Sequence, residues 1–105
     1  MSKWNYDLRA NGTTLREFIN ECDSSKESCE SVIDQVIVCC KYIQGMLAEE
    51  DKDWYEDDIE ELIQDCEDTK DYLDEDDEDS NEVNVDGLLG DFYDLMDLMR
   101  VWVAI

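Results

Sequence analysis

The chain has 105 residues, 43% of them hydrophobic, which is enough for one domain with a compact core. Its 31 acidic and 8 basic residues give a formal net charge of -23, which disfavours nucleic acid and anionic membranes as direct ligands and favours a basic protein surface. Because the sequence has no apolar run of about 18 residues and no signal-peptide layout at its start, we expect a soluble cytoplasmic protein with no membrane partner.

The first twelve residues are predicted to form a short extended segment. Apolar and polar side chains alternate there at Trp4, Tyr6 and Leu8. The pair Asn11-Gly12 then gives a turn signal. Residues 1–12 should therefore lie outside the helices.

Capping boxes predict where the first two helices begin. Thr14 and Glu17 have the spacing of such a box, in which a hydroxyl and a carboxylate satisfy free backbone amides, and they indicate a helix over about 14–23. Ser24 and Glu27 repeat the pattern before a second helix.

The second helix is predicted to be the central and most buried element. Its apolar stripe repeats every three or four residues. The stripe consists of Cys29, Val32, Ile33, Val36, Ile37, Cys40, Ile43, Met46 and Leu47. Val38 and Cys39 widen it, so this helix should touch neighbours on more than one side, and Cys39 should reach a neighbouring helix or an interface.

A third and a last helix are predicted over about 53–74 and 85–103, separated by a mobile acidic loop at 75–84. The third should bury Tyr55, Ile59, Leu62, Ile63, Cys66 and Leu73. The last should bury Leu88, Leu89, Phe92, Leu95, Met96, Met99 and Trp102. The expected fold is all-α: one domain, a compact antiparallel bundle of three to four helices.

The negative charge is concentrated in one stretch. From Glu49 to Asp86 there are 21 acidic residues against Lys52 and Lys70, so this stretch carries -19 of the total charge of -23. Such a run is often only a solvated face. Here the density of unfavourable like-charge pairs favours a functional role.

The third helix has a charge density close to that of a nucleic-acid strand. Its length of roughly 33 Å carries about one carboxylate per ~3 Å, against one phosphate per ~3.4 Å of single strand. The predicted partner-binding carboxylates there are Asp53, Glu56, Asp57, Asp58, Glu60, Glu61, Asp65, Glu67, Asp68, Asp71 and Asp74. Arginine pairs with carboxylate as it does with phosphate, so such a surface would compete for a nucleic-acid groove.

Two further features extend this predicted surface. On the last helix, Asp91 and Asp94 follow each other at helical spacing on one outer face, with Asp97 after them. Trp54 and Tyr55 open the third helix, and one of the two is expected to point outward, where it would serve as an apolar anchor.

Several other chemistries are not favoured. A calcium loop starting at Asp77 fails because Glu82 stands where the loop needs glycine and Leu88 stands where it needs glutamate. Five cysteines without a single histidine indicate reduced thiols rather than a zinc site or a disulfide framework. No metal, cofactor or catalytic residue is predicted, and we expect no enzymatic activity.

In character, the chain resembles the small acidic DNA-mimic proteins of bacteriophages and mobile elements, which include anti-restriction and anti-CRISPR proteins. The resemblance is carried by size, net charge and the acidic stretch from Asp53 to Asp86, about a third of the chain, without a family-specific motif. It implies a phage- or mobile-element-encoded inhibitor that occupies the nucleic-acid site of a bacterial defence protein, and it does not fix the target. Of two such targets, we prefer a CRISPR-Cas effector over a restriction enzyme.

Two other interpretations of the function stay open. The same surface would suit an acidic chaperone or antitoxin that sequesters a basic protein, and the chain would also suit a structural module in a larger phage or cellular assembly. Trp102, Val103 and Ile105 make the C-terminus apolar, which indicates either core or a contact between two copies in a homodimer.

Overall fold

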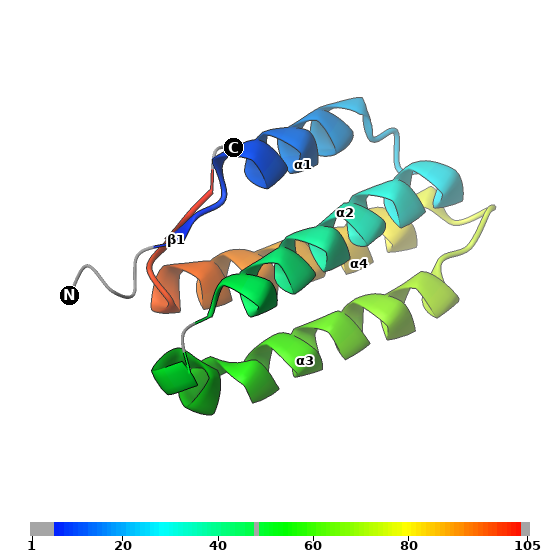
Figure 1. Ribbon diagram of the computed structural model, residues 1–105. Helices are drawn as coiled ribbons and strands as arrows, with labels where there is room; N and C mark the ends of the chain where they lie inside the picture. The colour runs from blue at the N-terminus through cyan, green and yellow to red at the C-terminus, as the bar shows by residue number, and fades with distance from the viewer. Residues whose placement is uncertain (1–5, 48, 104–105) are drawn as a thin grey trace.

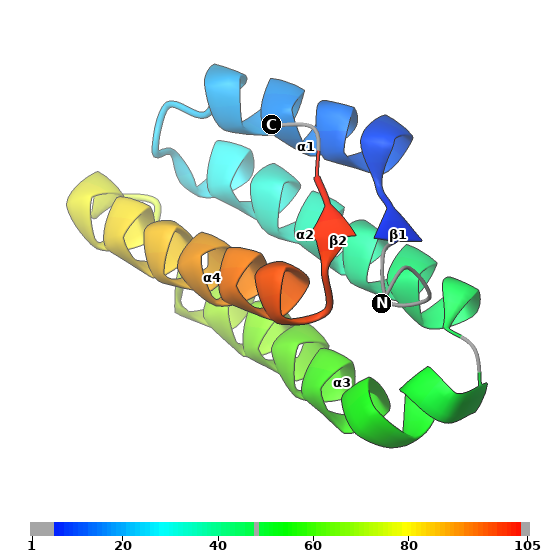
Figure 2. The same cartoon turned by 90° about the vertical axis from the view of Figure 1, so that its left-hand side faces the viewer.

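The computed structural model describes residues 6–47 and 49–103, which form four helices. The helices are α1 (Arg9–Glu21), α2 (Lys26–Met46), α3 (Glu49–Tyr72) and α4 (Glu78–Leu98). Successive helices run in opposite directions, and together they make an elongated antiparallel bundle with extents of 45 × 23 × 18 Å (Figures 1 and 2). The predicted all-α bundle is confirmed.

Helix α2 is the centre of the bundle, as predicted, because it contacts α1, α3 and α4. Its buried stripe includes Cys39, whose thiol lies 3.7 Å from the Asn11 carbonyl oxygen of α1, so this cysteine reaches a neighbouring helix. Val38 does not widen the buried stripe, since it is 48% exposed. The cap is Ser25 rather than Ser24, and its hydroxyl accepts from the Ser28 amide.

Helix α1 begins at Arg9, five residues before the predicted start, and the capping box at Thr14 is not used. Asn11 and Gly12 lie in the first helical turn of α1 and do not form the predicted turn before the helix. The reason is tertiary: the Leu8 amide donates to the Trp102 carbonyl at 2.9 Å, and Leu8 itself is fully buried. This contact ends the extended segment at residue 8.

The two chain ends meet in a small parallel pair of strands, β1 (Tyr6–Asp7) and β2 (Val101–Trp102). Helix α4 therefore ends at Leu98 and not at 103, and Arg100 takes a positive φ of 58° where the chain turns back. Trp102 is 51% exposed instead of buried, with the Arg9 guanidinium 5.1 Å from its ring centre. The predicted positions Trp4 and Ile105 lie outside the described residues.

The predicted acidic loop at 75–84 is mostly helix, because α4 already begins at Glu78. The Asp77 carboxylate accepts from the Ser80 amide and caps the helix. Glu78 and Asp79 then occupy the first turn, where the helix dipole favours negative charge. Only the short connection at 73–77 remains, so a count of like charges alone predicts too long a loop.

Helix α3 begins at Glu49 and ends at Tyr72, four residues before the predicted start and two before the predicted end. Its apolar face packs inward as expected, with Ile59, Leu62 and Cys66 buried and Tyr55 partly buried. Asp51, in the first turn, is only 1% exposed, so one carboxylate of this stretch belongs to the interior.

Candidate acidic interaction surface

The carboxylates of α3 are divided between different sides of the helix. Asp58, Glu61, Asp65 and Asp68 are spaced by three, four and three residues and so form one stripe. All four are exposed and line two consecutive shallow hollows between α3 and α4. This stripe lies beside the line along which α3 packs against α4.

Helix α4 completes the other wall of these hollows. Asp91 lines both of them, and Asp94 is exposed about one helical turn further on. We call the six carboxylates together the acidic seam: Asp58, Glu61, Asp65, Asp68, Asp91 and Asp94. The floor between the two rows is apolar, because Leu62, Leu88 and Leu95 also line the hollows.

A second group of α3 side chains faces α2 instead. Glu56 and Glu60 line a hollow shared with the end of α2, and Glu60 accepts a hydrogen bond of 2.6 Å from the Gln44 amide. The remaining predicted carboxylates on α3 itself, Asp53, Asp57, Glu67 and Asp71, are exposed away from the seam hollows. Asp74 lies beyond the end of the helix, where its backbone binds Asn81.

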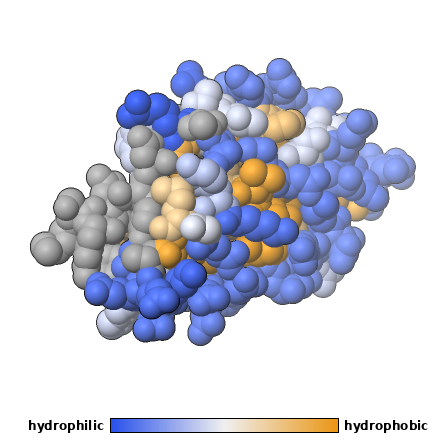
Figure 3. Space-filling model, viewed as in Figure 1, coloured by the Kyte–Doolittle hydropathy of each residue, from blue (hydrophilic) through white to orange (hydrophobic). Residues whose placement is uncertain are grey.

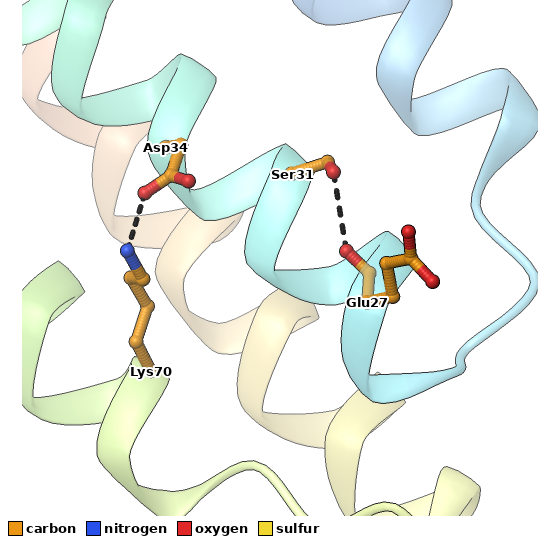
Figure 4. Close-up of polar contacts among 4 residues, drawn as sticks. All are labelled: Glu27, Ser31, Asp34 and Lys70. Carbon is orange, nitrogen blue, oxygen red and sulfur yellow. Dashed lines mark hydrogen bonds and ion pairs between the residues drawn. The ribbon is translucent and has the colours of Figure 1, made fainter.

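Both lysines of α3 lie on the side that faces α2. Lys70 donates to the Asp34 carboxylate of α2 at 2.6 Å (Figure 4), and this hydrogen bond raises the pKa of Lys70. Lys52 lines the hollow with Gln44 and Glu56. Helix α4 contains no basic residue from Glu78 to Leu98. Within the part of the chain that the structure describes, the seam is therefore purely acidic.

The charge spacing on the seam differs from that predicted for α3 as a whole. The eleven predicted carboxylates do not share one face, so the density of one per ~3 Å does not describe a real surface. The four α3 carboxylates of the seam span about 15 Å of helix axis. With Asp91 and Asp94 beside them, the seam carries about one charge per ~2.5 Å, between the values for a single strand and a duplex.

Large exposed side chains stand at the two ends of the seam. Trp54 is 73% exposed, whereas Tyr55 packs partly against the core, so Trp54 is the outward member of the predicted pair. Sequence reasoning did not single out Tyr72, Val83 and Leu98, which are 76%, 69% and 62% exposed. The periodicity alone could have found Tyr72, because it lies five helical turns after Trp54.

The face seen in Figure 3, on which α1, α2 and α3 lie, has a different character. Hydrophilic side chains cover its α3 edge, and an apolar patch lies above them in the middle of the view. Val38 and Tyr42 are the large exposed hydrophobic residues of α2. Unlike α4, these helices contain basic residues, among them Arg16 on α1 and Lys41 on α2.

The described residues offer no group of three or more cysteines and carboxylates arranged to hold a metal ion. Burial raises the pKa of the Cys29 and Cys66 thiols to about 12 and that of Cys39 to about 11. Among the described residues, none of the helices is long and apolar enough to span a bilayer.

Comparison of the chain with protein-family models, with curated proteins and with solved structures gave no match. The seam and its chemistry are thus the basis for any functional proposal.

Proposed function

We propose that this protein is a DNA-mimic inhibitor that occupies the nucleic-acid-binding site of a bacterial defence protein, a CRISPR-Cas effector in preference to a restriction enzyme. The observation that supports this is the separation of charge on α3. Its two lysines lie on the side toward α2, while the two hollows along its contact with α4 are lined by five carboxylates and no base.

The proposed mechanism is substitution of carboxylates for phosphates. Lysine and arginine side chains that neutralise a phosphate backbone would meet Asp58, Glu61, Asp65 and Asp68 along one line, with Asp91 on the facing helix. Exposed ion pairs contribute only about 0.2–1 kcal/mol each, so a useful affinity needs many of them at once. A folded helical pair holds them in place without the cost of ordering a flexible strand.

A second function is favoured by the carboxylates outside the seam. Asp53, Asp57, Glu67 and Asp71 are exposed and extend the negative surface of α3 beyond the seam. A wide surface of this kind suits an acidic chaperone or antitoxin that covers a basic protein on several sides. Such a protein need not compete with nucleic acid.

A matched pair of variants tests the proposal. The seam variant replaces Asp58, Asp65 and Asp68 by Asn and Glu61 by Gln. The control variant replaces Asp53, Asp57 and Asp71 by Asn and Glu67 by Gln, on the same helix and with the same loss of four charges. The wild-type protein is immobilised, and partners are captured from a lysate of the bacterium that hosts the encoding element. The affinities of both variants for the captured protein are then compared with that of the wild type.

We expect a captured nucleic-acid-binding protein to be displaced by oligonucleotides of about 30 nucleotides and by raising salt from about 0.05 to 0.5 M. The seam variant should lose about tenfold or more in affinity, and the control variant about threefold or less. Capture that no oligonucleotide displaces would favour the chaperone or antitoxin function. Equal losses in the two variants would show that net charge matters and the seam does not.

A further inference from the structure

Four of the seven large hydrophobic side chains exposed in the described part of the chain stand at the ends of the acidic seam. Trp54 precedes Asp58 by four residues, and Tyr72 follows Asp68 by four, so both belong to the same stripe of α3 as the carboxylates. About 27 Å of helix axis separates the two rings. Neither is held by packing within the chain, because each is more than 70% exposed.

Helix α4, which runs antiparallel to α3, also has an exposed hydrophobic side chain at each end of the seam. Val83 lines the hollow that contains Asp68, and Leu98 follows Asp94 by four residues near the other end of α4. Because α3 and α4 run in opposite directions, Leu98 belongs to the end of the seam where Trp54 lies, and Val83 to the end where Tyr72 lies (Figure 2). The acidic centre therefore has an apolar pair at each end.

We propose that the seam and its two apolar ends form one continuous contact surface for a protein site of the kind that holds single-stranded nucleic acid. Such sites combine a basic groove with aromatic platforms on which bases stack. The carboxylates would take the positions of phosphates, and the rings of Trp54 and Tyr72 would take the positions of stacked bases. This inference rests on the proposed function, and it adds the type of nucleic-acid site and the contacts at the two ends.

Charge complementarity selects this occupant over a second copy of the chain. Two seams placed face to face would bring twelve carboxylates together without a base, on molecules that each carry a net charge of -23. A purely apolar partner would leave the six central carboxylates desolvated and unpaired. A partner with lysine and arginine in the middle and apolar recesses at both ends satisfies the whole surface.

Site-specific photo-cross-linking tests this surface in the host lysate. A benzophenone amino acid is placed at position 54 or 72, and, as controls on other faces, at position 42 or 102. We expect adducts with one protein from 54 and 72 and none from 42 and 102. A single-stranded DNA oligonucleotide should suppress the adducts more strongly than the same sequence as duplex.

Affinity measurements with the captured protein give the second test. The double change Trp54→Ala and Tyr72→Ala should weaken binding about tenfold or more while leaving the slope of log affinity against log salt unchanged, because no charge is removed. The changes Trp54→Phe and Tyr72→Phe keep a ring and should lose about threefold or less, as should the control Tyr42→Ala. Circular dichroism confirms that each variant stays helical.

The two proposals fail in different ways. If oligonucleotides displace the partner but positions 54 and 72 give no adduct, or the alanine variants bind normally, this inference is wrong and the proposed function stands. If adducts form at 54 and 72 but resist both oligonucleotides, the proposed function and the single-strand assignment are both wrong. Adducts at position 42 would place the contact on the α2 face and overturn the inference.

Discussion

The turn between α1 and α2 is organised by one carboxylate, that of Asp23. Its Oδ1 accepts from the Ser25 amide at 3.1 Å and from the Ser28 hydroxyl at 2.7 Å. The hydrogen bonds from Ser25, and then those from Ser28, favour the charged form and lower the pKa of Asp23 to about 2. The side chain thus joins the end of α1 to the cap of α2.

This lowered pKa predicts a specific pH dependence. An aspartate has a pKa of about 3.9 in the unfolded chain, so Asp23 contributes stability above about pH 4 and loses that contribution as the pH falls toward 2. The carboxyl carbon resonance should titrate with a midpoint near 2, and urea unfolding should show the wild type and Asp23→Asn converging between pH 4 and pH 2. A midpoint near 4 would contradict these hydrogen bonds.

The cysteines should differ sharply in reactivity. Burial raises the pKa of Cys29, Cys39, Cys40 and Cys66, whereas Cys22 is only half-buried at the end of α1. Because the thiolate is the reactive form, iodoacetamide at pH 8 should modify Cys22 first and the other four very slowly. Mass spectrometry counts the adducts, and all five should react in guanidinium. Rapid native modification of Cys39 or Cys66 would contradict their burial.

At the scale of elements, a single buried amide connects three segments. The Asn81 side chain is fully buried, donates to the carbonyls of Ser24 and Asp74, and accepts from the Asp74 amide at 2.9 Å. It ties the first turns of α4 to the end of α3 and to the turn before α2. This contact holds in place the short connection that follows the acidic helix.

Asn81→Ala should therefore destabilise the protein by roughly 2–3 kcal/mol, because it leaves buried backbone groups without partners. Asn20→Ala, at an exposed position on α1, is the matched control and should change stability by less than about 0.5 kcal/mol. Urea unfolding followed by circular dichroism measures both. Equal effects of the two substitutions would mean that the Asn81 contacts contribute little.

The same elements show what the sequence can predict. The spacing of apolar residues at every third or fourth position identified all four helices and the central place of α2. This spacing can be predicted because it depends only on residues within each helix. Helix ends were predicted less well. A contact distant in sequence, Leu8 with Trp102, accompanies the early start of α1. The start of α4 has a local cap at Asp77, which the count of like charges overlooked, and a distant contact of Asn81 with Ser24 supports it. A capping motif such as Thr14 with Glu17 is not used when tertiary packing continues the helix past it.

The candidate surface was predictable in composition but not in layout. Counting identified the acidic stretch, and the Trp54–Tyr55 pair correctly implied one outward aromatic side chain. Which carboxylates share a face depends on where α2 and α4 pack against α3, and no local pattern contains that information. Asp58 and Glu60 are two residues apart, yet one lines the seam and the other binds Gln44 of α2.

At the scale of the whole molecule, the net negative charge should destabilise the fold and at the same time strengthen binding to a basic partner. Self-repulsion at a net charge of -23 opposes a bundle only 18–23 Å across, and the Lys70–Asp34 ion pair is itself partly exposed. Salt screens repulsion between exposed charges over a Debye length of about 10 Å at 0.1 M. It should therefore stabilise this fold while weakening an electrostatic complex.

Raising NaCl from about 0.02 to 0.5 M should raise the melting temperature of the isolated protein, opposite in sign to the expected effect on partner affinity. At low salt, the seam variant should be more stable than the wild type by roughly 1 kcal/mol and should therefore melt at a higher temperature. The reason is that it removes like-charge pairs that each cost a few tenths of a kcal/mol. Its response to salt should be correspondingly smaller. Thermal unfolding at 222 nm measures all three effects, and a melting temperature that falls with salt would show that attractive pairs, rather than repulsion, dominate the surface.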